Sequence, residues 1–357
     1  MQSFLQLVAH DLYAKIGNDL SRTALIFPNK RANLFFNEYL AGESDQPIWS
    51  PAAMSISDLF QKLSVQKSGD PIRLVCELYK VFKEETQSQE TLDDFYFWGE
   101  LLISDFDDVD KNMVDADKLF SNLQDLKNLM DDYEFLDKEQ EEAIQQFFQN
   151  FSIERRTELK EKFISLWDKL GTIYHHYREN LTELGIAYEG MLYRNVIEQL
   201  DTDQLKYDKY IFVGFNVLNK VENEFFRKLK DAGKALFYWD YDIFYTQQIR
   251  KHEAGEFLKR NLGEFPNELP ESFFDTFKEP KKIRYISAST ENAQARFLPE
   301  WIKMITDNHS QIAEEKEKEN AVVLCNEALL LPVLHSIPQE VKNVNITCLL
   351  YTSDAAD

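Results

Sequence analysis

Two segments of this 357-residue chain share one order of elements: a short apolar run, a turn and an amphipathic helical pattern. The first reads TALIFPNKRANLFFNEYL over residues 23–40, and the second reads YIFVGFNVLNKVENEFFRKL over residues 210–229. Another apolar run at 235–239 follows the second helix and completes a strand–helix–strand unit. Such units favour a parallel sheet with covering helices, so the sequence predicts an α/β fold.

The pattern between these two segments is almost wholly helical from residue 71 to about residue 200. Leu74, Leu78 and Val81 recur at the spacing of one buried helix face, and residues 163–174 repeat that signature. We predict an N-cap at Ser55 or Ser57 for a helix that carries Leu59, Phe60 and Leu63. Gly233 is the expected C-cap of the helix at 219–232.

A third segment follows the proline-containing stretch 266–280. We predict strands at 282–287, 321–325 and 341–347, and helices at 290–305 and 327–335. The expected organisation is a first α/β domain from 1–64 plus 206–278, a helical insertion at 65–205, and the start of a second α/β domain at 279–347. Residues 348–357 (CLLYTSDAAD) are expected to be foreign to the fold, and the natural protein to continue past Thr347.

Charge and cysteine content limit the classes of protein to which this chain can belong. The net charge is −22, but residues 90–142 alone hold 18 Asp and Glu against 4 Lys, which leaves −8 for the other 304 residues. A locally basic nucleic-acid site elsewhere is therefore compatible with the composition. Three scattered cysteines, no secretory leader and no long apolar run predict a cytoplasmic protein without a membrane partner.

The turn after the first strand reads Pro28-Asn29-Lys30-Arg31-Ala32. It resembles the Thr-Asn-Lys-Ala-Ala turn of superfamily-1 DNA helicases, which begins one wall of the channel for single-stranded DNA. Asn29 can hydrogen-bond a phosphate or sugar, Lys30 and Arg31 supply positive charge, and a helix N-terminus favours an anion. An ordinary polar turn explains the same residues equally well.

Two serines are candidates for the same channel. The segment SISDLF, with Ser55 and Ser57, resembles the helicase Thr-Phe-x-x-Leu segment that lines it. Helix starts of this composition are also common without any ligand.

The motifs for ATP hydrolysis are missing from the two strand–turn–helix segments. Gly214 and Phe215 fall where helicases carry the Asp-Glu pair that serves Mg²⁺, and a phenylalanine cannot hold the metal. No GxxxxGK[ST] loop is present to cradle phosphates before the first strand. Asp240 keeps an acid after the strand at 235–239, although an acid at the mouth of a sheet needs no such role. We expect that this part of the protein does not hydrolyse ATP.

Retained channel segments together with erased ATPase motifs resemble the AddB/RexB-type subunit of bacterial helicase–nucleases, a PD-(D/E)XK nuclease family, in its Bacteroidetes-like form. Phe97-Trp98-Gly99-Glu100 and residues 104–110 (SDFDDVD) resemble the helical-insertion signature of that family, and the likeness runs over residues 1–347.

The resemblance implies RecA-like cores and a non-catalytic, DNA-guiding part in the recombinational repair of double-strand breaks. It also implies a heterodimer with a motor subunit of the AddA or RecB type. A nuclease domain with Mg²⁺ and an iron–sulfur cluster is implied only beyond this chain, so no cofactor is expected here.

The sequence also bears on two other classes of protein. A helical scaffold with an acidic docking surface and no nucleic-acid role remains open. A nucleotide- or sugar-dependent transferase would need a glycine-rich turn between strand and helix, and the sequence shows none. The acidic run at 105–112 lacks the glycine and glutamate of a calcium-binding EF-hand loop.

Overall fold

The computed structural model describes residues 2–120, 156–247, 253–305 and 320–346. It is a mixed α/β protein, and its internal contacts divide it into two compact units, Met1–Lys278 and Glu279–Asp357.

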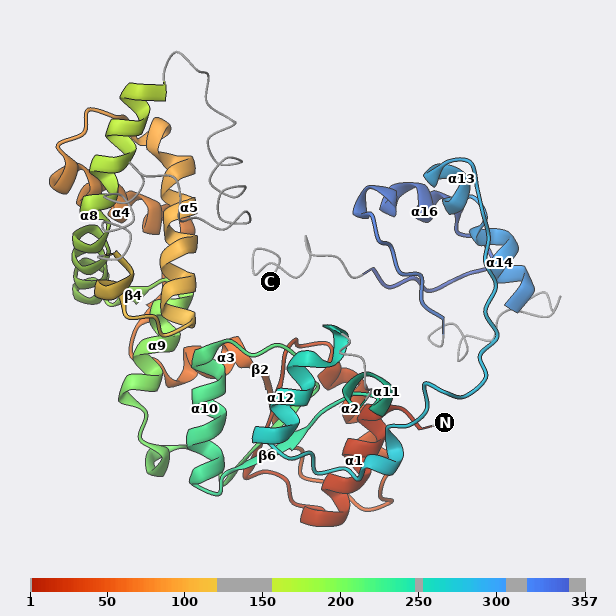
Figure 1. The fold of residues 1–357 in the computed structure, drawn as a ribbon. Helices are drawn as coiled ribbons and strands as arrows, with labels where there is room; N and C mark the ends of the chain where they lie inside the picture. The colour runs from red at the N-terminus through yellow and green to blue at the C-terminus, as the bar shows by residue number, and fades with distance from the viewer. Residues whose placement is uncertain (1, 121–155, 248–252, 306–319, 347–357) are drawn as a thin grey trace. The chain divides into compact units, whose positions relative to one another are not determined.

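The first unit contains a four-stranded parallel sheet flanked by helices (Figure 1). Its strands lie in the order β2 (Ala52–Ser55), β1 (Thr23–Phe27), β5 (Lys209–Val213) and β6 (Ala235–Tyr238). The predicted parallel sheet is thus confirmed, and all four strands have their carboxyl ends at the same edge. The sequence prediction did not include β2.

Helices cover both faces of this sheet because its strands are apolar on both sides. Leu25 and Phe27 pack into one core with α1 (Phe4–Ile16) and α2 (Ala32–Ala41). Ala24 and Ile26 point the other way, into a second core with α3 (Ile56–Leu63) and α10 (Lys220–Asp231). This alternation is the period of two that a strand imposes on its side chains. After α10, Gly233 takes the left-handed conformation (φ 65°) that commonly ends helices.

The segment between α3 and β5 is mainly helical, as predicted. Its longer described helices are α4 (Pro71–Thr86), α5 (Leu92–Lys111), α8 (Arg156–Glu183) and α9 (Glu189–Gln199). The insertion is not all-helical, because β3 (Lys67–Ser68) and β4 (Ile186–Ala187) form a short parallel pair that was not predicted. Leu74, Leu78 and Val81 are buried, as the helical spacing predicted.

Short elements complete the first unit. They are η3 (Thr202–Gln204), α11 (Ile243–Thr246), η4 (Glu253–Gly255), α12 (Glu256–Glu264) and η5 (Glu271–Phe273).

The second unit differs from the sequence prediction. It contains α13 (Glu291–Ala295), α14 (Leu298–Ile305), η6 (Glu327–Leu329) and α16 (Leu330–Ser336). The strands predicted at 282–287, 321–325 and 341–346 are wrong, because these residues have no regular secondary structure. A strand needs a hydrogen-bonded neighbour, and the described part of this unit contains no sheet. Thr347 and the tail 348–357 lie outside the described residues.

Proline explains why the two helices predicted in this unit are each divided. Pro299 has no N–H to donate to the carbonyl of Ala295, and α13 ends at that residue. Pro332 likewise cannot bond the carbonyl of Ala328, which lies in the short 3-10 turn η6. No described helix in either unit is long and apolar enough to cross a membrane.

Candidate nucleic-acid interface

The residues predicted to form a site all lie at or just beyond the carboxyl edge of the sheet. They are Asn29, Lys30 and Arg31 after β1, Ser55 and Ser57 at the end of β2, Gly214 and Phe215 after β5, and Asp240 after β6. The chain passes from β1 to β2 on one side and later places β5 on the other side of β1. Open parallel sheets bind ligands at such a switch point, beyond the carboxyl ends of the strands.

Asn29 shapes the start of α2. Its Oδ1 accepts hydrogen bonds from the backbone N–H groups of Arg31 and Ala32, at 3.1 and 3.3 Å. The polar-turn interpretation therefore accounts for the oxygen of this amide. These two bonds do not use its nitrogen, which is a donor suited to a phosphate oxygen.

Lys30 and Arg31 provide the positive charge at this edge. Lys30 is exposed, and its Nζ lies 3.8 Å from Oδ1 of Asp58 on α3. Such a long ion pair at the surface contributes little stability. Arg31 is half-buried at the N-cap position of α2.

Ser55 caps α3, which confirms the predicted N-cap. Its buried hydroxyl accepts from the Asp58 backbone N–H at 3.1 Å and donates to Asp58 Oδ2 at 2.7 Å. Burial alone would raise the pKa of Asp58, but the hydrogen bonds from Ser55 and the charges of Lys30 and Lys62 lower it. The Ser55 hydroxyl is thus engaged within the helix cap.

Ser57 points instead toward the helical insertion. Its hydroxyl donates to Oε1 of Glu189 at 3.3 Å, and Tyr193 donates to the same oxygen at 2.9 Å. Lys111 donates to Oε2 at 2.5 Å. Burial would raise the pKa of Glu189, but these hydrogen bonds and the Lys111 charge lower it. Ser57 therefore belongs to a polar cluster that joins α3, α5 and α9.

The positions of the missing magnesium motif contain no metal ligand. Gly214 is exposed in the left-handed region (φ 73°), and its N–H donates to the carbonyl of Tyr238 at 2.9 Å. Phe215 is only 4% exposed and packs edge-on against Phe226. Asp240 is exposed, and desolvation by the surrounding chain raises its pKa. In the part of the chain that the structure describes, no three His, Cys, Asp or Glu side chains are grouped to hold a metal.

Sequence reasoning missed one buried residue that supports this edge. Asn261 on α12 is fully buried, and its Nδ2 donates to the backbone carbonyl of Asn216 at 2.6 Å. This bond fixes the loop that follows β5. An isolated asparagine in a helical pattern carries no signal for such a role.

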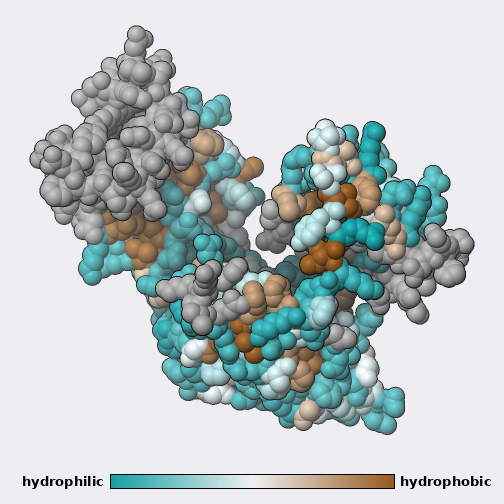
Figure 2. All heavy atoms as spheres, turned by 45° about the vertical axis from the view of Figure 1, so that its right-hand side comes forward, coloured by the Kyte–Doolittle hydropathy of each residue, from teal (hydrophilic) through white to brown (hydrophobic). Residues whose placement is uncertain are grey.

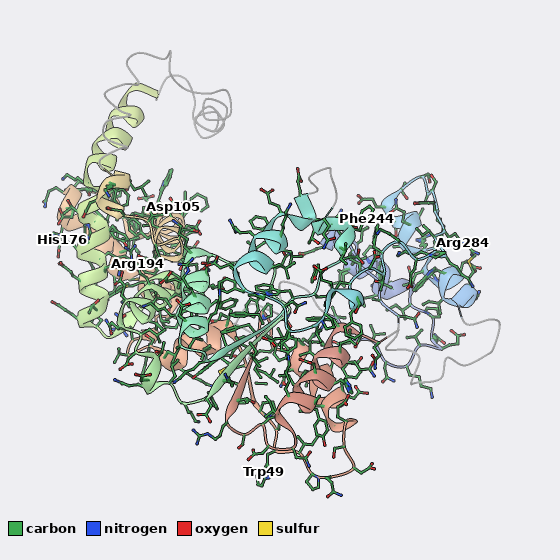
Figure 3. The ribbon with its side chains drawn as sticks, turned by 60° about the horizontal axis from the view of Figure 1, so that its bottom comes forward. Trp49, Asp105, His176, Arg194, Phe244 and Arg284 are labelled. Carbon is green, nitrogen blue, oxygen red and sulfur yellow. The ribbon has the colours of Figure 1, made fainter. Side chains whose placement is uncertain are left out.

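Exposed apolar side chains near the same edge were also missed. Leu34 and Phe35 are exposed in the first turn of α2, and Val217 is exposed in the loop after β5. In the space-filling view, apolar residues interrupt a mainly hydrophilic surface (Figure 2). Aromatic side chains such as Phe35 suit the stacking of unpaired bases. Trp49, by contrast, precedes β2 at the amino edge and points away from the protein (Figure 3).

Two residues of the helical-insertion signature, Gly99 and Asp107, have clear structural roles. At Gly99 a Cβ atom would lie 2.9 Å from Val75 Cγ1, so this glycine lets α4 and α5 approach closely. Oδ1 of Asp107 accepts from the N–H of Gly190 at 2.5 Å and fixes the start of α9.

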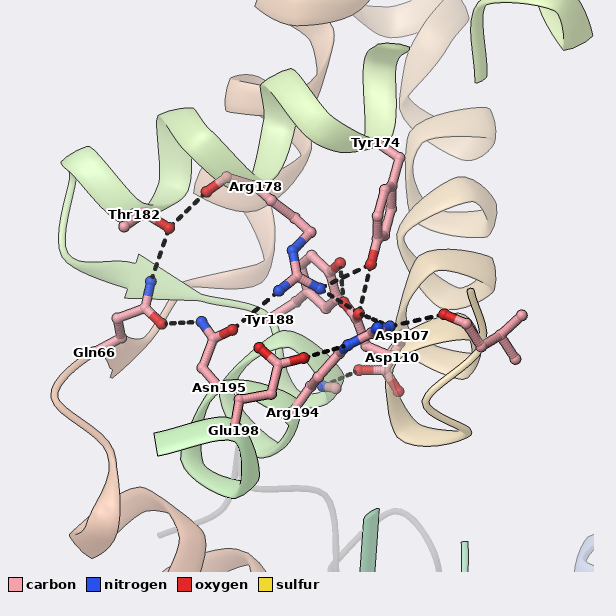
Figure 4. A network of polar contacts seen from close by, with 12 residues as sticks. Gln66, Asp107, Asp110, Tyr174, Arg178, Thr182, Tyr188, Arg194, Asn195 and Glu198 are labelled. Carbon is pink, nitrogen blue, oxygen red and sulfur yellow. Dashed lines mark hydrogen bonds and ion pairs between the residues drawn. The ribbon is translucent and has the colours of Figure 1, made fainter. Parts of the chain in front are cut away.

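Asp110 is the centre of a buried polar network (Figure 4). Tyr174 and Tyr188 donate to its two oxygens at 2.6 and 2.5 Å. Arg178 forms an ion pair with it, and Arg194 Nη1 lies 3.3 Å from Oδ1. The network connects α5, α8 and α9 and is fully paired, so it stabilises the helical insertion and leaves no group for a ligand.

Comparison with protein-family models and with curated proteins found no match for this chain.

Proposed function

We propose that this chain is the non-catalytic, DNA-guiding part of an AddB-type subunit, and that the carboxyl edge of its sheet binds the backbone of single-stranded DNA. One observation carries the proposal: Asn29, Lys30 and Arg31 follow β1 at the switch point of a parallel sheet. The phosphate backbone needs such donors and charges for positioning, whatever the base sequence.

The proposed core is a RecA-like domain without nucleotide chemistry. Its support is the parallel order β2-β1-β5-β6, interrupted between α3 and β5 by a helical insertion. In the helicase resemblance, Gly214 and the buried Phe215 take the positions of the magnesium ligands of an active motor. We therefore expect DNA binding that does not depend on ATP.

The wider assignment rests on the sequence resemblance. It comprises a cytoplasmic complex for double-strand-break repair and a heterodimer with an AddA- or RecB-type motor. Nuclease chemistry with Mg²⁺ and an iron–sulfur cluster would belong to a domain outside this chain. No described residue is assigned to either group.

The test compares two double variants of equal charge change. Lys30→Ala with Arg31→Ala removes one lysine and one arginine at the carboxyl edge. Arg22→Ala with Lys209→Ala removes the same two residue types at the amino edge, where Lys209 is paired with Thr23, the residue after Arg22. Affinity for labelled single-stranded DNA is measured at several salt concentrations, with ATP binding in parallel.

We expect the carboxyl-edge variant to bind roughly tenfold more weakly at 0.1 M salt, for every DNA sequence tried. Its slope of log K against log salt should fall by up to about 1.4, because each phosphate contact on a single strand contributes about 0.7. The amino-edge variant should bind like the unaltered chain. Equal affinities of the two variants would contradict the proposed site, and ATP binding would contradict the non-catalytic assignment.

The helical scaffold is the second candidate, favoured by the acidic, partly apolar surface of α5. It predicts no salt-dependent affinity for DNA at all. The absence of DNA binding by the unaltered, folded chain would therefore favour the scaffold.

A further inference from the structure

One face of α5 combines exposed apolar side chains with carboxylates. Phe97 is 71% exposed and Leu101 is 41% exposed, and the two are one helical turn apart. Around them on the outer side of the helix lie exposed acidic residues, which we name together with Phe97 and Leu101 the α5 face: Asp93, Asp94, Glu100, Asp105 and Asp108. Figure 3 shows Asp105 on this helix.

The opposite side of α5 accounts for the packing of the helix. Phe95, Phe106 and Val109 are buried there, in the core that α5 shares with α4, α8 and α9. The apolar residues of the α5 face are therefore not needed for that core. Exposed aromatic residues beside charged ones are typical of sites that bind another protein.

The charges of the α5 face are of one sign. The only lysine or arginine of this helix is Lys111, which points toward Asp107 and Glu189 instead, at 2.8 and 2.5 Å. Partial desolvation and the neighbouring Asp108 together raise the pKa of Asp105. A cationic partner would relieve this repulsion.

We propose that the α5 face binds an amphipathic, lysine- or arginine-rich helix of another protein. The apolar stripe of that helix would pack on Phe97 and Leu101, and its basic flanks would lie against the surrounding carboxylates. An amphipathic helix presents apolar residues one turn apart, which is also the spacing of Phe97 and Leu101 on α5. The site is independent of the DNA interface, because it lies on the helical insertion.

The negative charge of the α5 face also argues against two other occupants, a second copy of this chain and the chain's own residues 121–155. In a two-fold dimer the same face meets itself, which would bring the carboxylates of both copies together. Residues 121–155 of the chain contain nine acidic and three basic residues, so they too are a poor electrostatic match. A basic helix from a different protein is the complementary choice.

The probe is a labelled peptide of leucine and lysine, about 18 residues long, with leucines at helical spacing. A peptide of the same composition in scrambled order serves as the control for charge alone. The full chain is compared with Phe97→Ser/Leu101→Ser and with Asp105→Asn/Asp108→Asn. The matched control is Val65→Ser/Ile72→Ser, which removes apolar side chains that are 90% and 61% exposed elsewhere on the same unit.

We expect the full chain to prefer the amphipathic peptide, and Phe97→Ser/Leu101→Ser to weaken binding about tenfold. Asp105→Asn/Asp108→Asn should weaken it less and reduce its salt dependence. The control variant should bind within about twofold of the unaltered chain. Melting curves establish that each variant is folded.

Three results would overturn the proposal. They are equal affinity for ordered and scrambled peptides, equal losses in the Phe97/Leu101 and control variants, and self-association of the chain that disappears with Phe97→Ser/Leu101→Ser. The last would assign the α5 face to a second copy of this protein.

Discussion

Asp110 shows how much a single residue depends on its surroundings. A carboxylate without solvent exposure is costly unless its charge is paired and its oxygens are hydrogen-bonded. Here two tyrosines and two arginines satisfy both conditions, and they come from positions 64 to 84 residues further along the chain. The run SDFDDVD gave no indication of which acid is buried, because the answer lies in those distant partners.

Replacing this carboxylate should therefore destabilise the helical insertion. We expect Asp110→Asn to lower the free energy of unfolding by about 3 kcal/mol, because Arg178 and Arg194 lose a buried counter-charge. Asp108→Asn, at an exposed position of the same helix, should change it by less than about 0.5 kcal/mol. Urea unfolding followed by circular dichroism measures both, and similar values for the two variants would contradict the assigned role.

At the scale of elements, the start of α3 connects the end of β2 with Lys30 of the candidate interface. Ser55 ends β2, caps α3 and bonds Asp58, which in turn lies near Lys30. The same cap thus orders the helix and places an acid beside the proposed DNA contact.

The free energy that the Ser55 cap contributes to folding should depend on pH. We expect Ser55→Ala to cost about 1 kcal/mol of unfolding free energy at neutral pH. The pKa of Asp58 is lowered in the folded protein, so its contribution is present above its unfolded value of 3.8 and lost as pH falls through the folded pKa. The difference between variant and unaltered chain should therefore shrink at about pH 3.

Ser57→Ala is the matched control for this experiment. Its hydroxyl bonds Glu189 and caps nothing, so the cost should stay below about 0.5 kcal/mol. Urea unfolding at neutral pH and at about pH 3 measures the cost of each substitution. A cost of Ser55→Ala that is constant with pH would show that Asp58 makes no charge-dependent contribution.

Most elements of the first unit could be predicted from the sequence, for a definite reason. The strands β1, β5 and β6 are continuous apolar runs, and the helices next to them repeat apolar residues every three or four positions. β2 carries the less distinctive residues AAMS, and its pairing with β1 makes it a strand. The strands predicted in the second unit had the right composition, but composition does not supply a neighbouring strand.

The residues of the predicted site all lie at one edge of the sheet, since strand ends follow from strand positions. The functions of its side chains could not be predicted in the same way. Ser55 and Asn29 bond their own helix starts, and Ser57 bonds a residue 132 positions away. Only the folded arrangement shows these competing partners.

At the scale of the whole molecule, buried apolar residues are divided very unequally between the two units. Both large cores, one on each face of the sheet, lie within Met1–Lys278. In the second unit the described core consists of three buried residues, Ala295, Leu298 and Val333. Stability from burial scales with the apolar area removed from water, so the first unit should hold nearly all of it.

A chain ending at Lys278 tests this inference. We expect the fragment 1–278 to keep the cooperative thermal transition of the full chain, because no residue of its two cores lies beyond Phe274. The fragment 279–357 alone should show no such transition, since a core of this size cannot offset the conformational entropy of its backbone. Calorimetry of both fragments measures the outcome. A fragment 1–278 that fails to fold would mean that the second unit contributes contacts essential to the first.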